Sequence, residues 1–142
     1  MVEGKITRIS GPIVFAEGLD SCGLYDVVDV GEKHLIGEII RQSKGKTTIQ
    51  VYEEDTGMHI GEKIVCNNRP LSLQLGPGLV GTIYDGIQRP LKTMSEQSGA
   101  FLLSGERAEP LDAEKKWDFV KNEGIDEGAA IKPGAVLGTI IF

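Results

Sequence analysis

One stretch of the chain carries the residue types that a phosphate-binding loop uses. Gly45, Lys46 and Thr47 match the end of the pattern Gly-x-x-x-x-Gly-Lys-[Ser/Thr], in which backbone N–H groups and a helix N-terminus face the phosphates. The first glycine of that pattern would fall at position 40, which is Ile40, and β-branched and aromatic residues alternate after Thr47. This alternation is typical of a strand. We therefore predict a β-hairpin with residues 44–46 at its tip, and no nucleotide site.

The other side chains that could do chemistry are scattered along the chain. The acidic run at residues 53–55 ends a predicted strand, and we interpret it as a solvated turn rather than a metal site. His34 and His59 have no partners at the spacing of a metal or catalytic cluster. Cys22 and Cys66 lack the spacing of metal ligands or redox motifs, which indicates two reduced thiols. We expect no catalytic, cofactor-binding or metal-binding residue in this sequence.

Composition and charge exclude several classes of partner. The 142 residues are 40% hydrophobic and 25% charged, with a net charge of −6. Because the acidic residues are spread along the chain, no basic stripe is available for a phosphate backbone, and we expect no nucleic-acid partner. No signal peptide opens the sequence, and its apolar runs are far shorter than a membrane span. These features predict a soluble, intracellular protein without direct membrane insertion.

Strand signals dominate residues 1–72. Six short runs alternate apolar and polar residues between turn residues, which predicts a mostly β fold with a small closed N-terminal barrel. Gly11 and Pro12 interrupt the first run, and we expect a bulge or sharp bend that lets one strand serve two sides of the barrel. The last run places Leu71, Leu73 and Leu75 at period two. The positions predicted for the core are Ile6, Ile13, Val28, Val30, Ile36, Ile39, Ile49, Val51, Ile64 and Leu73.

A connector is predicted over residues 73–91, where the pattern changes in the stretch GPGLVGTIYDGIQRP. Apolar residues there stand near helical spacing, with Pro77 and Gly78 at the expected start of a short helix and Gly86 at its end. The residues expected to anchor this helix are Leu79, Val80, Ile83 and Tyr84. The Arg89-Pro90 pair then forces an extended exit.

Residues 92–142 are turn-rich and contain fewer strand signals. We predict one strand around Trp117 to Val120 and a type II turn at Lys132-Pro133-Gly134 between two further strands. The sequence stops on three apolar residues, Ile140 to Phe142, from which we expect a piece of a longer protein. The alternative is a chain whose last strand pairs at its terminus.

Seven stretches, taken in order, carry a family resemblance. They are GKITRISGPIVFAEGL, YDVVDVGE, LIGEII, TTIQVYEEDTG, GEKIV, RPLSLQLGPGLVGTIYDGIQRPL and LDAEKKWDF. Together they resemble the start of the catalytic A subunit (alpha chain) of archaeal/vacuolar-type rotary ATPases, and the resemblance covers nearly the whole chain. LGPGLVGTIYDGIQRPL and IQVYEEDTG are its most specific parts.

The resemblance implies a domain order and a function for the parent protein. Residues 1–72 would be the barrel, 73–91 the connector, and 92–142 the start of a β-rich peripheral insertion, or bulge. The parent would bind ATP or ADP with Mg²⁺ and couple ATP hydrolysis or synthesis to H⁺ or Na⁺ transport. It would work in the cytoplasm, in a soluble head peripheral to the membrane, with the B subunit and stator or stalk subunits as partners. The family's nucleotide-binding domain lies farther along, so this part is expected to be a structural and assembly module without catalysis.

The connector is our candidate for a mechanical joint between the barrel and the moving domains. A joint needs residues that tolerate unusual backbone angles beside residues that restrict them, although an ordinary rigid linker carries the same glycines and prolines. We expect the Tyr84 hydroxyl to have a polar partner. Alanine at Gly86 should cost on the order of 1 kcal/mol if that glycine needs a positive φ angle. The structural and joint candidates are Gly11, Pro12, Gly76, Pro77, Gly78, Tyr84, Asp85, Gly86, Arg89 and Pro90.

A stand-alone carrier or adaptor-type β module without an ATPase role is the alternative function. The segment IKPGAVLGTI has the strand–turn–strand character of lipoyl- and biotinyl-type domains, which present a modified lysine at a hairpin tip. Lys132 is the candidate for that modification. It precedes a proline and lacks the flanking methionine or aspartate of those domains, so the match is weak.

Overall fold

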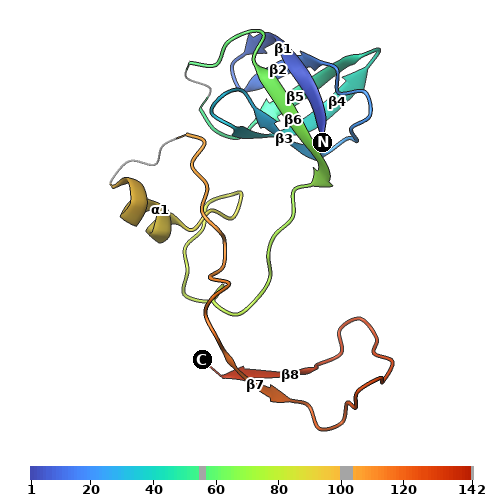
Figure 1. The fold of residues 1–142 in the computed structure, drawn as a ribbon, viewed down its shortest axis with the longest axis vertical. Helices are drawn as coiled ribbons and strands as arrows, with labels where there is room; N and C mark the ends of the chain where they lie inside the picture. The colour runs from blue at the N-terminus through green and yellow to red at the C-terminus, as the bar shows by residue number, and fades with distance from the viewer. Residues whose placement is uncertain (55–56, 100–103, 142) are drawn as a thin grey trace.

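The computed structural model describes residues 1–54, 57–99 and 104–141, and these residues are mostly β (Figure 1). Six strands are followed by one helix and two short strands, and Asp55 and Phe142 lie outside the described residues. The elements are β1 Val2–Ser10, β2 Ile13–Glu17, β3 Asp26–Val30, β4 Leu35–Ser43, β5 Lys46–Val51, β6 Lys63–Pro70, α1 Leu91–Ser98, β7 Asp118–Lys121 and β8 Gly138–Ile141. None of the described helices is long and apolar enough to cross a membrane.

The first six strands close into a barrel, which confirms the predicted fold class. Their order around the barrel is β1-β2-β5-β4-β3-β6, and β6 returns to pair with β1. All neighbouring strands are antiparallel, and the pairing slips in three strands. Such bulges bend a strand and increase its twist, which lets short strands curl into a closed barrel. The slips fall between Ile6 and Arg8 in β1, Asp26 and Val28 in β3, and Ile39 and Arg41 in β4.

Two tight turns set the strand pairing. Lys44 and Gly45 have φ angles of 50° and 75° and join β4 to β5, which confirms the hairpin predicted in place of a phosphate-binding loop. Gly11 and Pro12 join β1 to β2 in another two-residue turn, with the residues on either side paired. The prediction of a bend inside one strand is therefore wrong. Gly11 has a φ of 57°, which lets the chain reverse completely.

Apolar side chains at alternate strand positions fill the barrel, and most of the predicted core is buried there. Ile13 was predicted inside but follows the β1–β2 turn directly, so Val14 faces inward instead. Ile36 is only half-buried because Leu35 takes the inward position, and Leu73 is 60% exposed outside the barrel. The buried apolar residues of the barrel that the prediction omitted are Val14, Ala16, Leu19, Cys22, Leu35 and Cys66.

The connector begins without the strand predicted at residues 71–75. Strand β6 ends at Pro70, and Leu71, Leu73 and Leu75 are 38%, 60% and 82% exposed. These three leucines pair with no neighbouring strand, and a strand needs a hydrogen-bonded partner as well as a period-two pattern. The barrel still has six strands, because the segment predicted as the first strand forms two strands, β1 and β2.

The helix of the connector is displaced from its predicted position. Residues 77–90 form turns, and α1 starts at Leu91, after Pro90 at its N-cap with a φ of −75°. Gly78 and Gly81 have φ angles of 97° and 87°, which a right-handed helix cannot include. The prediction of a helix from Pro77 to Gly86 is therefore wrong. Val80 and Ile83 point into solvent with 85% and 72% exposure, so they anchor no helix.

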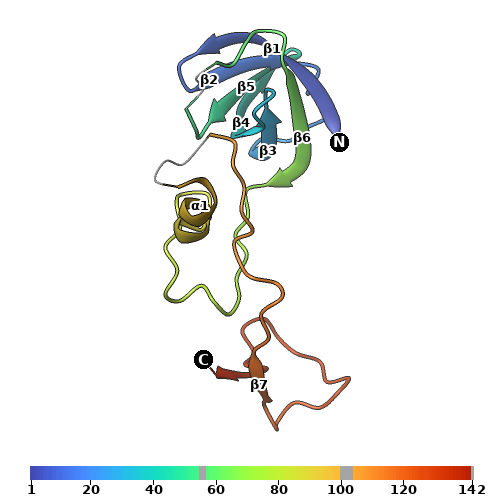
Figure 2. The ribbon, with the colours of Figure 1, turned by 60° about the vertical axis from the view of Figure 1, so that its left-hand side comes forward.

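The last part of the chain forms a two-stranded sheet that lies away from the barrel (Figures 1 and 2). Strand β7 confirms the strand predicted near Trp117, and it pairs with β8 at the end of the described chain. The predicted turn is present: Ala135 N donates to Lys132 O at 3.1 Å, and Gly134 has a φ of 85°. The residues just before Lys132 form no strand, so Lys132 does not stand at the tip of a paired hairpin.

Candidate functional site

The structure brings part of the predicted joint together where the connector meets the barrel. Tyr84, Asp85, Arg89 and Pro90 lie in one tight loop before α1, closed by the backbone pairing of Tyr84 with Pro90. Gly86 projects from this loop into solvent. Gly76, Pro77 and Gly78 belong to turns earlier in the connector, and the β1–β2 turn with Gly11 and Pro12 is not part of this group.

Asp85 organises the loop through its carboxylate. Its Oδ1 atom accepts hydrogen bonds from Ile87 N at 3.0 Å and Arg89 N at 2.8 Å, and its Oδ2 atom accepts one from Arg89 Nε at 2.7 Å. The backbone N–H of Asp85 donates to Arg89 O at 3.1 Å. A short acidic side chain that accepts backbone hydrogen bonds two to four residues on is a common way to close a turn. The loop is therefore held in one conformation by its own sequence.

Arg89 links this loop to the barrel through Glu53. Its Nη1 atom lies 2.6 Å from Glu53 Oε2, and the Glu53 side chain is only 5% exposed. The same carboxylate accepts hydrogen bonds from Ile36 N at 3.3 Å and from Gly105 N at 2.9 Å. Glu53 was predicted to be a solvated turn residue, and that prediction is wrong because a cation 36 positions away covers it. Barrel, connector and the segment after α1 thus meet at one carboxylate.

Within the cluster of Glu53, Arg89 and Asp85, hydrogen bonds and opposite charge favour the ionised forms of Asp85 and Arg89. Burial alone would raise the pKa of Asp85, but the hydrogen bonds and charge of Arg89 and the N–H of Ile87 lower it below its ordinary value. Burial alone would lower the pKa of Arg89, yet its hydrogen bonds with Asp85 and Glu53 raise it. Both carboxylates are engaged by this one cation. The cluster can therefore hold segments together, but it has no free acid or base for catalysis.

A second contact joins the segment after α1 to the β3–β4 turn. Arg107 forms an ion pair with Asp29 and donates to His34 O at 3.4 Å. Gly105 has a φ of 82°, and a Cβ atom there would lie 2.0 Å from Lys33 O. Only glycine fits so close to another backbone. Residues 104–107 therefore lie directly on the barrel.

Two further hydrogen-bonded contacts hold the connector in shape. Gln88, which is 6% exposed with a φ of 63°, accepts from Gln74 N and donates to Gln74 O, both at 2.7 Å. The Tyr84 hydroxyl donates to Pro110 O at 2.8 Å, which confirms the polar partner predicted for it. Gln88 carries no sequence signal for this role, because its partner is another polar residue in a loop.

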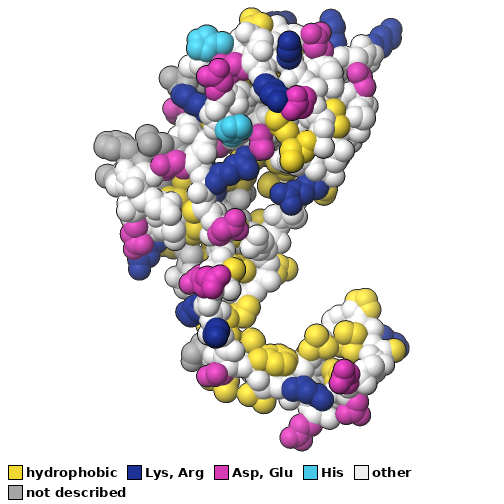
Figure 3. Space-filling view, viewed as in Figure 1, with side chains coloured by type: hydrophobic (Ala, Val, Ile, Leu, Met, Phe, Trp, Pro, Cys, Tyr) yellow, Lys and Arg dark blue, Asp and Glu magenta, His cyan; other side chains and the backbone are white. Residues whose placement is uncertain are grey.

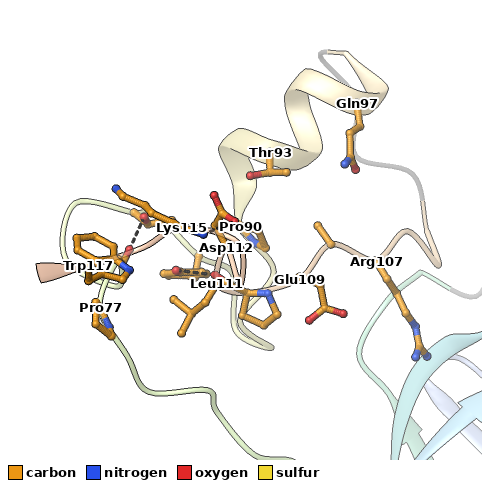
Figure 4. A pocket seen from close by; sticks show the side chains of 15 residues that line it. Pro77, Pro90, Thr93, Gln97, Arg107, Glu109, Leu111, Asp112, Lys115 and Trp117 are labelled. Carbon is orange, nitrogen blue, oxygen red and sulfur yellow. Dashed lines mark hydrogen bonds between the residues drawn. The ribbon is translucent and has the colours of Figure 1, made fainter. Parts of the chain in front are cut away.

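A groove of about 650 Å³ lies between the connector, α1 and residues 107–117 (Figure 4). Thr93 and Gln97 line it from α1, and Pro77 and Leu111 line it from the two facing segments. Lys115 Nζ lies 4.1 Å from the centroid of the Trp117 ring. The ammonium group of Lys115 therefore makes a cation–π contact with Trp117 of the same chain.

Lys46 and Thr47 do not form a phosphate-binding loop in the structure. Thr47 is buried inside the barrel, and Lys46 stands on a strand paired with Ser43 rather than at a helix N-terminus. No three His, Cys, Asp or Glu side chains among the described residues are arranged to hold a metal ion. What the site offers chemically is attachment between segments.

Comparison with known proteins shows which class of protein the barrel resembles. Residues 6–68, nearly the whole barrel, match the family described as "ATP synthase alpha/beta family, beta-barrel domain". Among its relatives, the A subunit of the A-type ATP synthase of Thermoplasma volcanium is 51% identical over 137 residues, which are 96% of this chain and 17% of that protein. The V-type ATP synthase alpha chain of Clostridium perfringens is 48% identical over 141 residues, which are 99% of this chain and 24% of that protein.

The barrel belongs to the ATP synthase alpha/beta family, and nearly the whole chain is similar to the A subunits of A-type ATP synthases and the alpha chains of V-type ATP synthases, which confirms the resemblance found in the sequence. A further member, from Clostridium novyi, is 44% identical over 140 residues. The chain spans between 17% and 24% of the length of these curated relatives.

Proposed function

We propose that this chain is the barrel-bearing part of the catalytic subunit of an A/V-type ATP synthase, which couples ATP hydrolysis or synthesis to H⁺ or Na⁺ transport. Its relatives carry the names of such subunits, and its barrel matches their barrel domain. The task of the chain itself is structural. The barrel keeps its place in the assembled head, and the connector leads to the domains that bind nucleotide.

The observation that carries the structural role is the buried cluster of Glu53, Arg89 and Asp85. A mechanical joint needs one fixed end and one stretch that changes its backbone angles. The cluster supplies a fixed end at residues 84–90. We assign the deformable stretch to residues 71–83, which have no regular structure and contain exposed apolar side chains and two glycines with positive φ angles.

The parent protein supplies the remaining chemistry in this proposal. ATP or ADP with Mg²⁺ binds outside this chain, because Lys46 and Thr47 are built into a hairpin. The B subunit and the stator or stalk subunits are the partners, and residues 92–142 begin the peripheral insertion that reaches outward. The parent works in the cytoplasm as part of the head, peripheral to the membrane. Nucleic acid has no part in it.

The joint can be tested with two alanine substitutions in the full-length protein. Gly81 has a φ of 87° and Gly86 has an ordinary φ, and a Cβ atom at either position would meet nothing within 4 Å. Gly81→Ala therefore adds only backbone strain of about 1 kcal/mol, and Gly86→Ala is its matched control. The measurements are assembly of the complex, by native mass spectrometry, and ATPase turnover of the assembled complex.

We expect Gly81→Ala to assemble normally but to turn over up to about fivefold more slowly, the factor that 1 kcal/mol gives when strain must be relieved or increased during the cycle. Gly86→Ala should match the wild type in both measurements. Equal turnover in both variants would make residues 71–83 a passive linker. Failure of both variants to assemble would contradict the structural role assigned to the loop.

A further inference from the structure

One face of the barrel, away from the junction with the connector, carries a row of residues that crosses four neighbouring strands. Arg8 of β1 pairs with Phe15 of β2, Phe15 pairs with Thr48 of β5, and Thr48 pairs with Arg41 of β4. None of the four is buried, so their side chains lie on the outside of the barrel. We name these four residues the basic row. Figure 3 shows Lys and Arg side chains, with Asp and Glu side chains among them, on the surface of the barrel at the top of the view.

The arginines of the basic row form no ion pair with the part of the chain that the structure describes. Arg8 lies over the Phe15 ring, with 5.4 Å between its Cζ atom and the ring centroid. Within the described ranges, Arg8, Arg41, Lys44 and Lys46 form no ion pair. The arginines of the connector and of the segment after α1, in contrast, are both paired with carboxylates. Stacking on Phe15 holds one guanidinium in place while leaving its hydrogen-bond donors free.

A shallow hollow of about 340 Å³ lies beside the row. Its lining combines an aromatic ring and a threonine methyl group with hydroxyl groups and three cations, and it includes no carboxylate. An apolar side chain could enter this hollow while carboxylates on either side meet the cations. The lining residues are Phe15, Arg41, Ser43, Lys44, Lys46 and Thr48.

We propose that the basic row binds an extended acidic segment of a partner protein, with carboxylates at positions i and i+4 and an apolar side chain at i+2. Neighbouring strands lie about 4.8 Å apart, so the path over the curved barrel surface from Arg8 to Arg41 crosses three spacings, about 14 Å in all. An extended segment rises about 3.3 Å per residue, which places its residues i and i+4 about 13 Å apart on the same side. Each arginine can then take one carboxylate in two hydrogen bonds, and the apolar side chain meets Phe15.

The surrounding charge favours a short acidic segment over a polyanion. Glu17 follows Phe15 on β2, Glu38 precedes Arg41 on β4, and Asp20 lies near the β4–β5 turn. A nucleic acid or an anionic lipid surface would extend beyond the row and meet these carboxylates, and the chain as a whole has a net charge of −6. A segment with only two carboxylates avoids them.

The test uses the 142-residue chain and a fluorescein-labelled peptide, Gly-Ser-Glu-Thr-Leu-Thr-Glu-Ser-Gly, in an anisotropy titration at low salt. One control peptide has both glutamates replaced by glutamine, and another places them three positions apart, on opposite sides of an extended chain. The row variant is Arg8→Glu with Arg41→Glu. The matched control is Lys121→Glu with Lys132→Glu, two exposed lysines outside the barrel that give the same change in net charge.

We expect the row variant to bind the peptide about tenfold more weakly, and the control variant to stay within about twofold of the wild type. Both control peptides should also bind more weakly than the first. Equal weakening by the two variants, or no binding by the wild type, would overturn the proposal. Tighter binding to single-stranded DNA or to phosphatidylserine vesicles would overturn it in favour of a polyanion. If circular dichroism shows that the row variant is unfolded, Arg41→Gln alone replaces it, with an expected loss of about threefold.

Discussion

Replacing Arg89 with methionine should detach the connector from the barrel and leave the barrel folded. Methionine keeps much of the length of the side chain but leaves the carboxylates of Glu53 and Asp85 without a cation, at 5% and 21% exposure. Removing one member of a buried ion pair typically costs about 3–5 kcal/mol. Because both carboxylates keep backbone N–H donors, we expect the lower end of that range, about 3 kcal/mol, which increases the detached fraction more than 100-fold.

Hydrogen exchange followed by mass spectrometry measures this detachment directly. Amide protons within residues 84–99 and 104–107 should exchange much faster in Arg89→Met, because their protection depends on docking. Amides of β1 and β2 should keep their rates, since their hydrogen bonds lie within the barrel. Lys92→Met is the matched control: its side chain is 86% exposed, and its ion pair with Glu96 is 4.0 Å long and weak.

Exchange in residues 84–99 and 104–107 that stays within about twofold of the wild type would refute this reasoning, because it would mean that the cluster does not hold the connector. Unfolding of the barrel together with the connector would refute the claim that the two are separable. A double-mutant cycle with Glu53→Gln should give a coupling energy of about 1–3 kcal/mol between Glu53 and Arg89.

Three more outcomes are expected. The folded-state pKa of Asp85 is lowered, so its stabilising effect should be complete above 3.8, the ordinary value, and should be lost as the pH falls further; exchange protection of the connector should decrease there, and less so in Asp85→Asn. Gly105→Ala should lower the thermal stability of the docked segment more than Gly128→Ala, because both have positive φ angles but only Gly105 faces another backbone. Burial and the neighbouring Cys66 raise the pKa of Cys22 to about 12, so Cys22 in the native protein should react with a disulfide reagent at least about 100-fold more slowly than free cysteine; rapid labelling at neutral pH would contradict this.

The barrel could be predicted because the pattern that defines each of its strands lies within a short stretch of sequence. Alternation within each strand determines which side chains face inward, and residues such as Val28, Val30, Ile49 and Val51 follow this rule. One error occurred where a chain reversal changes the alternation. At Ile13, a two-residue turn shifted the inward position by one.

The junction could be predicted only in part, because its contacts are distant in sequence. Asp85 and Arg89 were among the joint candidates, and their four-residue spacing is visible in the sequence. Glu53 meets Arg89 from 36 positions away, and nothing in an acidic run distinguishes the buried carboxylate from the solvated ones. Gly105 is required by the approach of a distant backbone segment at Lys33, which no local pattern indicates.

The attachment of residues 104–107 to the barrel determines how a pulling force would travel through the molecule. The chain leaves the barrel after Pro70, contacts it through Arg89, and contacts it again at Gly105 and Arg107, so the intervening chain is anchored at both ends. Tension applied at the β7–β8 hairpin would reach the barrel through Arg107 and Asp29 before it stretched that intervening chain. The hairpin can therefore act as a handle on the barrel, and loads from outside need not pass through the glycines at 78 and 81.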